Sequence, residues 1–187
     1  MTVKGQFAHG RKVFPCSTRD LLEQSNELRK LLCLKNIFKF PVIKFLEAMQ
    51  RLYDDFDFEI VDKCELPKGY FAQYNPILGL VSISETIYKM ANDINNKGYG
   101  FARWTILHEC LHHILHRNQL AALTRQDNLP HKIYEDSEWQ VDTLASFLLM
   151  PPDMVNANMT VDFISQTFGV SPKAARNRLE GLRKERR

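Results

Sequence analysis

The sequence predicts an α+β fold that is mainly helical, with a small antiparallel three-stranded sheet and a C-terminal helical cap that resembles a helix-turn-helix. Two patterns support this prediction. Over most of the chain, apolar residues recur every three or four positions, which is typical of helices packed on a core. Between residues 56 and 84, short apolar runs alternate with turn residues, which is typical of strands. The 187 residues, 44% of them hydrophobic, suffice for one domain with a sizeable core.

Two helices are expected in the first third of the chain. Ser17 suits the N-cap of the first, because Asp20 follows three residues later, and this helix is expected to run to about Leu34. Pro41 suits the first position of the second helix, since proline lacks the N–H that this position leaves unpaired. The residues before Ser17 are interpreted as an irregular lead-in.

Three short strands are expected next, near residues 58–61, 70–74 and 80–83. The second and third are separated by Asn-Pro and a glycine, which are turn-forming residues. A small antiparallel sheet is the simplest arrangement of three such strands. Ser84 can then cap a further helix.

The stretch from residue 101 to 117 is expected to be a largely buried helix that carries the motif H-E-x-x-H. On a helix, His108 and His112 lie one turn apart on the same face, so both imidazoles can bind one metal ion. Glu109 lies beside the first of them and can act as the general base for a water molecule. The alternative is a helix whose histidines are purely structural. Two histidines and a glutamate at these offsets rarely arise by chance, which favours the metal site.

A catalytic zinc site usually has three protein ligands and a fourth position for water. Residues 135–150 form the next predicted helix, and Glu138 is the candidate third ligand. Asp142 lies one turn further on, where it can accept a hydrogen bond from the distal nitrogen of a ligating histidine. These acids could instead form a solvated face. That interpretation fits Glu135 and Asp136 better than Asp142, which has apolar neighbours.

Residues 103–116 read R-W-T-I-L-H-E-C-L-H-H-I-L-H, and they are followed by Glu138, by Asp142 and by F-L-L-M-P at residues 147–151. This combination resembles the ImmA/IrrE family of metallopeptidases, from about residue 71 to the C-terminus. It is far more specific than H-E-x-x-H alone. The chain departs from the family pattern at positions that are not candidate ligands, namely Leu111 in place of Gly, Val141 in place of Ala, and His113 directly after His112.

The resemblance implies a zincin-like metallopeptidase domain over residues 1–159, with residues 160–187 packed on the same domain. It implies zinc as the cofactor, although a His-His-carboxylate site also accepts manganese. It further implies that the substrate is a helix-turn-helix transcriptional repressor, and that cleavage relieves repression.

In the expected reaction, Glu109 takes a proton from water and passes it to the leaving amine. Candidates for stabilising the oxyanion are His116, His131 and Tyr134. His116 is about 80° around the helix from His108, so it fits a contact behind a ligand or at the helix end better than a ligand. The strand at residues 80–83 is expected to be an exposed edge on which the substrate pairs, unless it is an interior strand.

Two alternatives remain open. Residues 160–182 could bind DNA through Lys173, Arg176 and Arg178, but packing as a cap is favoured because many apolar residues there need burial. The chain could also be a non-catalytic, metal-containing regulator that binds a repressor. Glu109 argues against this alternative, since a binding protein needs no general base at that position.

The composition limits the possible location and partners of the protein. The four cysteines are scattered without a C-x-x-C pair, so free thiols are expected. No apolar run reaches eighteen residues and no signal-peptide core is present, which predicts a cytoplasmic protein with no membrane partner. A net charge of +3 does not by itself imply a nucleic-acid partner.

Overall fold

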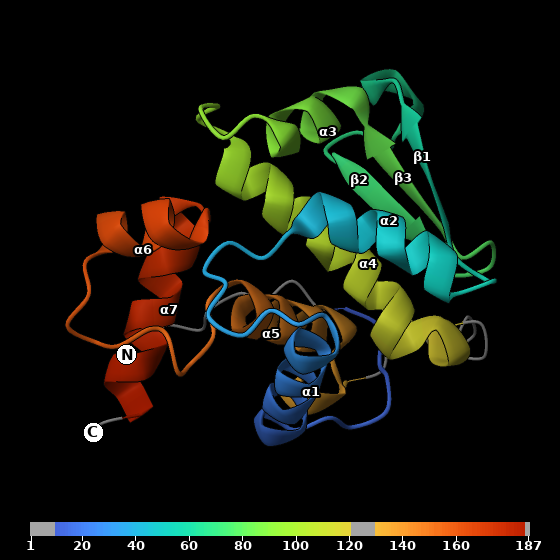
Figure 1. The fold of residues 1–187 in the computed structure, drawn as a ribbon. Helices are drawn as coiled ribbons and strands as arrows, with labels where there is room; N and C mark the ends of the chain where they lie inside the picture. The colour runs from blue at the N-terminus through green and yellow to red at the C-terminus, as the bar shows by residue number, and fades with distance from the viewer. Residues whose placement is uncertain (1–9, 121–129, 186–187) are drawn as a thin grey trace.

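The computed structural model describes residues 10–120 and 130–185 (Figure 1). The elements follow the order α1 Thr18–Leu31, α2 Val42–Leu52, β1 Asp57–Val61, η1 Lys63–Glu65, β2 Ala72–Asn75, β3 Leu80–Ser84, α3 Glu85–Asn92, α4 Tyr99–Leu120, η2 Ile133–Glu135, α5 Ser137–Leu149, α6 Val161–Phe168 and α7 Pro172–Glu185. The prediction of a mainly helical α+β fold is confirmed. Within the described ranges, no helix combines the length and the apolar character needed to span a lipid bilayer.

The helix α4 packs against α2, α3, α5 and two strands of the sheet. Figure 1 shows it crossing the molecule, with α2, α3 and the sheet on one side and α5 and α1 on the other. Its buried face reflects the mixed three- and four-residue spacing of its apolar side chains. The fully buried members are Ala102, Ile106, Leu107, Cys110 and Leu111.

The helix α1 begins as predicted. The Ser17 hydroxyl accepts a hydrogen bond from the backbone N–H of Asp20, and the Asp20 carboxylate accepts one from the N–H of Ser17. Further along α1, the buried Arg29 donates to the carbonyls of Leu148 (2.8 Å) and Leu34 (2.9 Å). A single guanidinium therefore ties α1 to the C-terminal end of α5.

The sheet is mixed, so the prediction of a fully antiparallel sheet is wrong for one pairing. The tight turn between β2 and β3 makes that pair antiparallel, as expected. The longer connection from β1 to β2, which includes η1, lets β1 lie on the far side of β3 and run parallel to it. Since the strand order is β1-β3-β2, β3 is central, and the prediction that residues 80–83 form an exposed edge is also wrong.

The C-terminal pair of helices contacts the start of α4 through Arg103. Gly169 ends α6 in the left-handed conformation, with φ 63°, which suits a residue without a Cβ. The buried Arg103 guanidinium donates to the carbonyls of Phe168 (2.9 Å), Gly169 and Phe40. Ile164 and Phe168 are also buried in the core cluster that contains α4. The boundary between residues 159 and 160 remains a prediction, and residues 1–9 and 186–187 lie outside the described ranges.

Candidate metal centre

Three side chains from α4 and α5 converge in one cluster. His108 and His112 are one turn apart on α4, and their Nε2 atoms are 3.1 Å from each other. Glu138 is in the first turn of α5, with Oε2 3.0 Å from Nε2 of His108 and Oε1 3.3 Å from Nε2 of His112. The packing of α5 against α4 thus unites residues that are separated by up to 30 positions in sequence.

The geometry of this cluster fits a divalent metal ion. Ligands about 2 Å from a tetrahedral zinc ion lie about 3.3 Å from one another. The two Nε2 atoms are 3.1 Å apart, and each lies 3.0 or 3.3 Å from one of the two Glu138 oxygens, which is close to that spacing. Two imidazoles and a carboxylate also form a donor set that zinc and several other divalent ions accept. His108, His112 and Glu138 could therefore hold a metal together.

Asp142 supports the first histidine of the cluster. Its Oδ1 lies 3.1 Å from Nδ1 of His108, on the side of the ring opposite Glu138. This position, one turn after Glu138 on α5, is the one expected for a carboxylate that orients a ligating imidazole. The rest of the Asp142 carboxylate remains accessible to solvent, since this side chain is 57% exposed.

The electrostatics of the cluster favour a cation. Burial opposes a charge on His108, but hydrogen bonds to Asp142 and Glu138 outweigh it and raise the pKa of His108 to about 10. Burial likewise opposes ionisation of Glu138, yet its hydrogen bonds to His108 and His112 hold its pKa well below the usual range. The carboxylates therefore stabilise positive charge at this point.

Glu109 is held in place by a strand of the sheet. Its Oε2 accepts a hydrogen bond from the backbone N–H of Tyr74 on β2, at 2.8 Å. Burial raises the pKa of Glu109, although His108 and His112 act in the opposite direction. The Tyr74 ring is parallel to that of His112, at 6.5 Å between centroids, and its hydroxyl lies 2.9 Å from Nδ1 of His113. A single residue of β2 thus touches Glu109 through its backbone and His112 through its ring.

A cleft of about 1000 Å³ opens over the cluster. His108, Glu109, His112 and Glu138 line one part of it. The β2 strand and the turn that follows it line another part, including Ile77 and Leu78, which are 78% and 65% exposed. Large aliphatic side chains at the tip of a turn are not needed for the core, so they are available to a ligand in the cleft.

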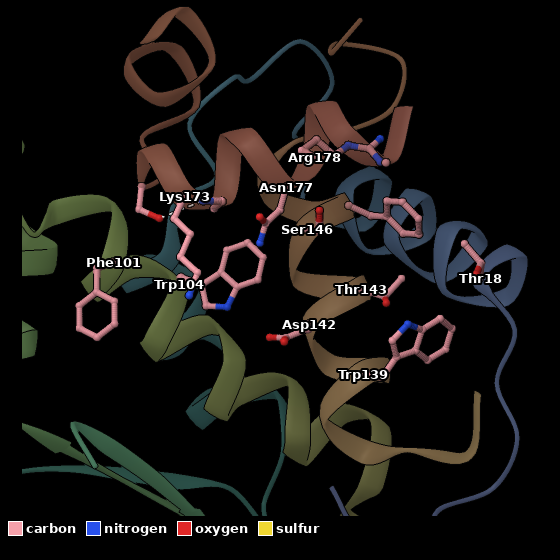
Figure 2. Close-up of a pocket in the computed structure, with 14 residues that line it drawn as sticks. Thr18, Phe101, Trp104, Trp139, Asp142, Thr143, Ser146, Lys173, Asn177 and Arg178 are labelled. Carbon is pink, nitrogen blue, oxygen red and sulfur yellow. Dashed lines mark hydrogen bonds between the residues drawn. The ribbon is translucent and has the colours of Figure 1, made fainter. Parts of the chain in front are cut away.

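A second cleft, of about 660 Å³, lies between α4, α5 and α7. Figure 2 shows Asp142 projecting from α5 towards α4, with Trp104 and Asn177 near it and Trp139 on the preceding turn of α5. Asp142 therefore lines this aromatic cleft and also contacts His108 of the metal cluster.

The three candidate oxyanion residues lie in different surroundings. His116 is fully buried behind His112, with 3.4 Å between their Nδ1 atoms, so it fits the second of its predicted roles, a contact behind a ligand. Burial lowers the pKa of His116 to about 4, which keeps it neutral. His131 bonds to Asp136 at 2.9 Å, and the Tyr134 carbonyl accepts from Gln140. Neither His131 nor Tyr134 lines the cleft over the cluster.

The structure adds three residues that the sequence analysis missed. They are Tyr74, which holds Glu109; Gln140, whose Oε1 lies 3.0 Å from Nε2 of His116; and Gly10, which packs against the backbone of Glu138. Two of these contacts involve backbone atoms or the absence of a side chain. Such contacts leave no sequence motif, so no signal in one sequence could have identified Tyr74 or Gly10.

The basic residues proposed for DNA binding do not form one exposed face. Lys173 and Arg176 are exposed on α7, whereas Arg178 is only 8% exposed and its guanidinium lies over the Phe147 ring, 5.3 Å from the centroid. Arg178 therefore packs against α5, and the set predicted for phosphate contacts loses one of its three members.

Comparisons with known proteins bear on the same region. Residues 100–180 match the model of the family Peptidase_M78, described as an IrrE N-terminal-like domain. No curated protein sequence matches the chain. Among solved structures, the chain is similar to a Mycobacterium tuberculosis transcriptional regulator, with a TM-score of 0.59 and 14% identity over 87% of this chain. That likeness concerns the fold, and this chain spans 46% of the length of that structure.

Proposed function

We propose that this chain, a member of the ImmA/IrrE family through its residues 100–180, is a zinc-dependent endopeptidase. The observation that carries the proposal is the convergence of His108, His112 and Glu138 beside Glu109, all facing one cleft. A group of ligands alone would suit a structural metal. The additional carboxylate, which lies in the same cleft and is held by a backbone N–H, suits catalysis.

A zinc ion held by these ligands would supply Lewis acidity, which activates water and polarises a peptide carbonyl. Glu109 then accepts the proton of the attacking water at its carboxylate and delivers it to the leaving amine. Its burial supports this role, because a raised pKa makes a carboxylate a stronger base. The Tyr74 N–H keeps one oxygen of Glu109 fixed, which leaves the other for the proton transfer.

The edge available to the substrate is β2 rather than β3. The N–H of Tyr74 points away from β3 and towards Glu109, so the outer edge of β2 faces the cleft. Because Glu109 occupies the Tyr74 N–H, an extended peptide could pair with this edge through the other outward backbone groups of β2, as in other complexes that add a strand to a sheet. The exposed side chains of Ile77 and Leu78 would then contact apolar side chains of the substrate. We propose a helix-turn-helix repressor as the substrate, since the family resemblance implies one.

The test compares cells that produce the wild-type chain with cells that produce Glu109→Gln. New protein N-termini, identified by mass spectrometry of terminal peptides, are expected only with the wild type, and one should fall within a helix-turn-helix repressor. Glu85→Gln, on the exposed first turn of α3, is the matched control and should behave as the wild type. Identical sets of N-termini with Glu109→Gln and the wild type would refute the mechanism. Loss of repression without any new N-terminus would support the non-catalytic regulator instead.

A further inference from the structure

A buried chain of hydrogen-bonding groups lies behind His112. Nδ1 of His112 is 3.4 Å from Nδ1 of His116, and Nε2 of His116 is 3.0 Å from Oε1 of Gln140. His116 is fully buried, and Gln140 is 2% exposed. Three polar groups in such surroundings must satisfy one another, because an unpaired buried donor or acceptor is costly.

The direction of this chain is set at Gln140. Its Nε2 donates to two backbone carbonyls, those of Phe14 and Tyr134, each at 2.8 Å. An amide that donates twice from nitrogen must present its oxygen on the other side, which faces His116. Oxygen can only accept, so the N–H of His116 must be at Nε2 and its lone pair at Nδ1.

The tautomer of His116 then determines the tautomer of His112. With a lone pair at Nδ1 of His116, the facing Nδ1 of His112 must carry the hydrogen and donate it. The lone pair of His112 is therefore at Nε2, which points towards His108 and Glu138. We propose that Gln140 and His116 are positioning residues that lock His112 in the tautomer able to bind a divalent metal through Nε2.

This inference rests on the proposed metal centre and adds a second kind of support to it. His108 is backed directly by the carboxylate of Asp142, which is exposed to solvent. His112 is backed by two neutral groups in a buried position, where an uncompensated carboxylate would be unfavourable. The final acceptors are the carbonyls of Phe14 and Tyr134, so the segment before α1 takes part in fixing a ligand on α4.

A different explanation is that Gln140 only anchors the segment around Phe14. The chain offers a matched control for that explanation. Gln119 Oε1 accepts a hydrogen bond from the N–H of Phe14 at 2.7 Å, so it anchors the same residue, and its amide nitrogen donates to the Leu115 carbonyl rather than to His116. If anchoring were the whole role of Gln140, replacing either glutamine would have the same effect on metal binding.

The experiment measures zinc affinity by competition with a chelator for the wild type, Gln140→Leu and Gln119→Leu, each checked for folding by circular dichroism. We expect Gln140→Leu to weaken zinc binding about 10- to 100-fold, as for other groups that orient metal ligands, and Gln119→Leu to retain wild-type affinity. Equal affinities for all three chains, or equal losses in both variants, would overturn the proposal. Absence of zinc binding by the wild type would instead remove the metal centre itself.

A second measurement needs no variant, should Gln140→Leu fail to fold. Long-range ¹H–¹⁵N NMR of the zinc-loaded wild type distinguishes protonated from unprotonated imidazole nitrogens. The proposal requires hydrogen on Nδ1 of His112 and on Nε2 of His116. Hydrogen on Nδ1 of His116 would contradict the proposal, because that nitrogen could not then accept from His112.

Discussion

Oδ1 of Asp142 lies 3.1 Å from Nδ1 of His108, one helical turn after Glu138, whose Oε2 lies 3.0 Å from Nε2 of the same ring. The imidazole is therefore held at both nitrogens by residues of a single helix. If Glu138 and His108 share a metal ion, Asp142 fixes the ring that presents one of the ligands.

Replacing Asp142 by Asn should weaken zinc binding about 10-fold or more, because an amide orients the imidazole without the negative charge. Competition with a chelator measures this change. Asp162→Asn, an exposed acid in the first turn of α6, is the control and should leave the affinity unchanged. Unaltered binding by Asp142→Asn would mean that this carboxylate does not support the metal.

Gly10 allows the segment before α1 to lie directly on Glu138. A Cβ at this position would be 2.7 Å from the Glu138 backbone nitrogen and 2.8 Å from its Cγ, closer than such atoms approach. Gly10→Ala should therefore displace Glu138 and lower zinc affinity. Gly181→Ala adds a Cβ with no atom within 4 Å and should bind zinc normally. Equal affinities in the two variants, measured by calorimetric titration, would show that Gly10 has no bearing on the site.

Cys110 lies within the H-E-x-x-H motif but faces the core. Burial raises the pKa of its thiol, and a neutral, inaccessible thiol reacts slowly. Titration of the native chain with a coloured disulfide reagent should modify the exposed Cys33 and Cys64 first and leave Cys110 unmodified until the chain unfolds. Rapid labelling of Cys110 in the native state, located by peptide mapping, would contradict its placement.

Arg103 is expected to control how firmly the C-terminal helices are held. Arg103→Ala removes the donor for three carbonyls, on Phe168, Gly169 and Phe40, and should reduce the free energy of unfolding by about 3 kcal/mol. Arg19→Ala breaks an exposed pair with Glu23, which solvent screens, and should leave the free energy of unfolding close to that of the wild type. Urea denaturation compares the two, and similar losses would mean that the Arg103 contacts contribute little.

Most of the helices, and the site residues on them, could be predicted from the periodicity of the apolar side chains. The spacing of His108 and His112 requires only a helix, and the apolar pattern around them predicts one, so both residues meet as expected. Glu138 and Asp142 follow the same logic on α5. These predictions depend on local geometry that a few residues determine.

The predictions that failed depend on how distant segments meet. The parallel pairing of β1 with β3 follows from the path of residues 62–71, whose composition does not specify on which side of the sheet β1 lies. Tyr74 holds Glu109 through its backbone N–H, which every residue except proline possesses. Arg178 belonged to the less favoured DNA-binding alternative, and only the packing of α7 against Phe147 shows that it is not an exposed phosphate contact.

The most direct test of the account is the metal content of three chains purified side by side without chelators, namely wild type, Glu109→Gln and Glu138→Ala. The account predicts about one zinc ion per chain in the first two, because Glu109 is not a ligand, and little zinc in the third. Equal zinc in all three would show that Glu138 does not bind the metal. Little metal in any of them, with none taken up on addition of zinc, would contradict the metal centre and with it the proposed peptidase activity.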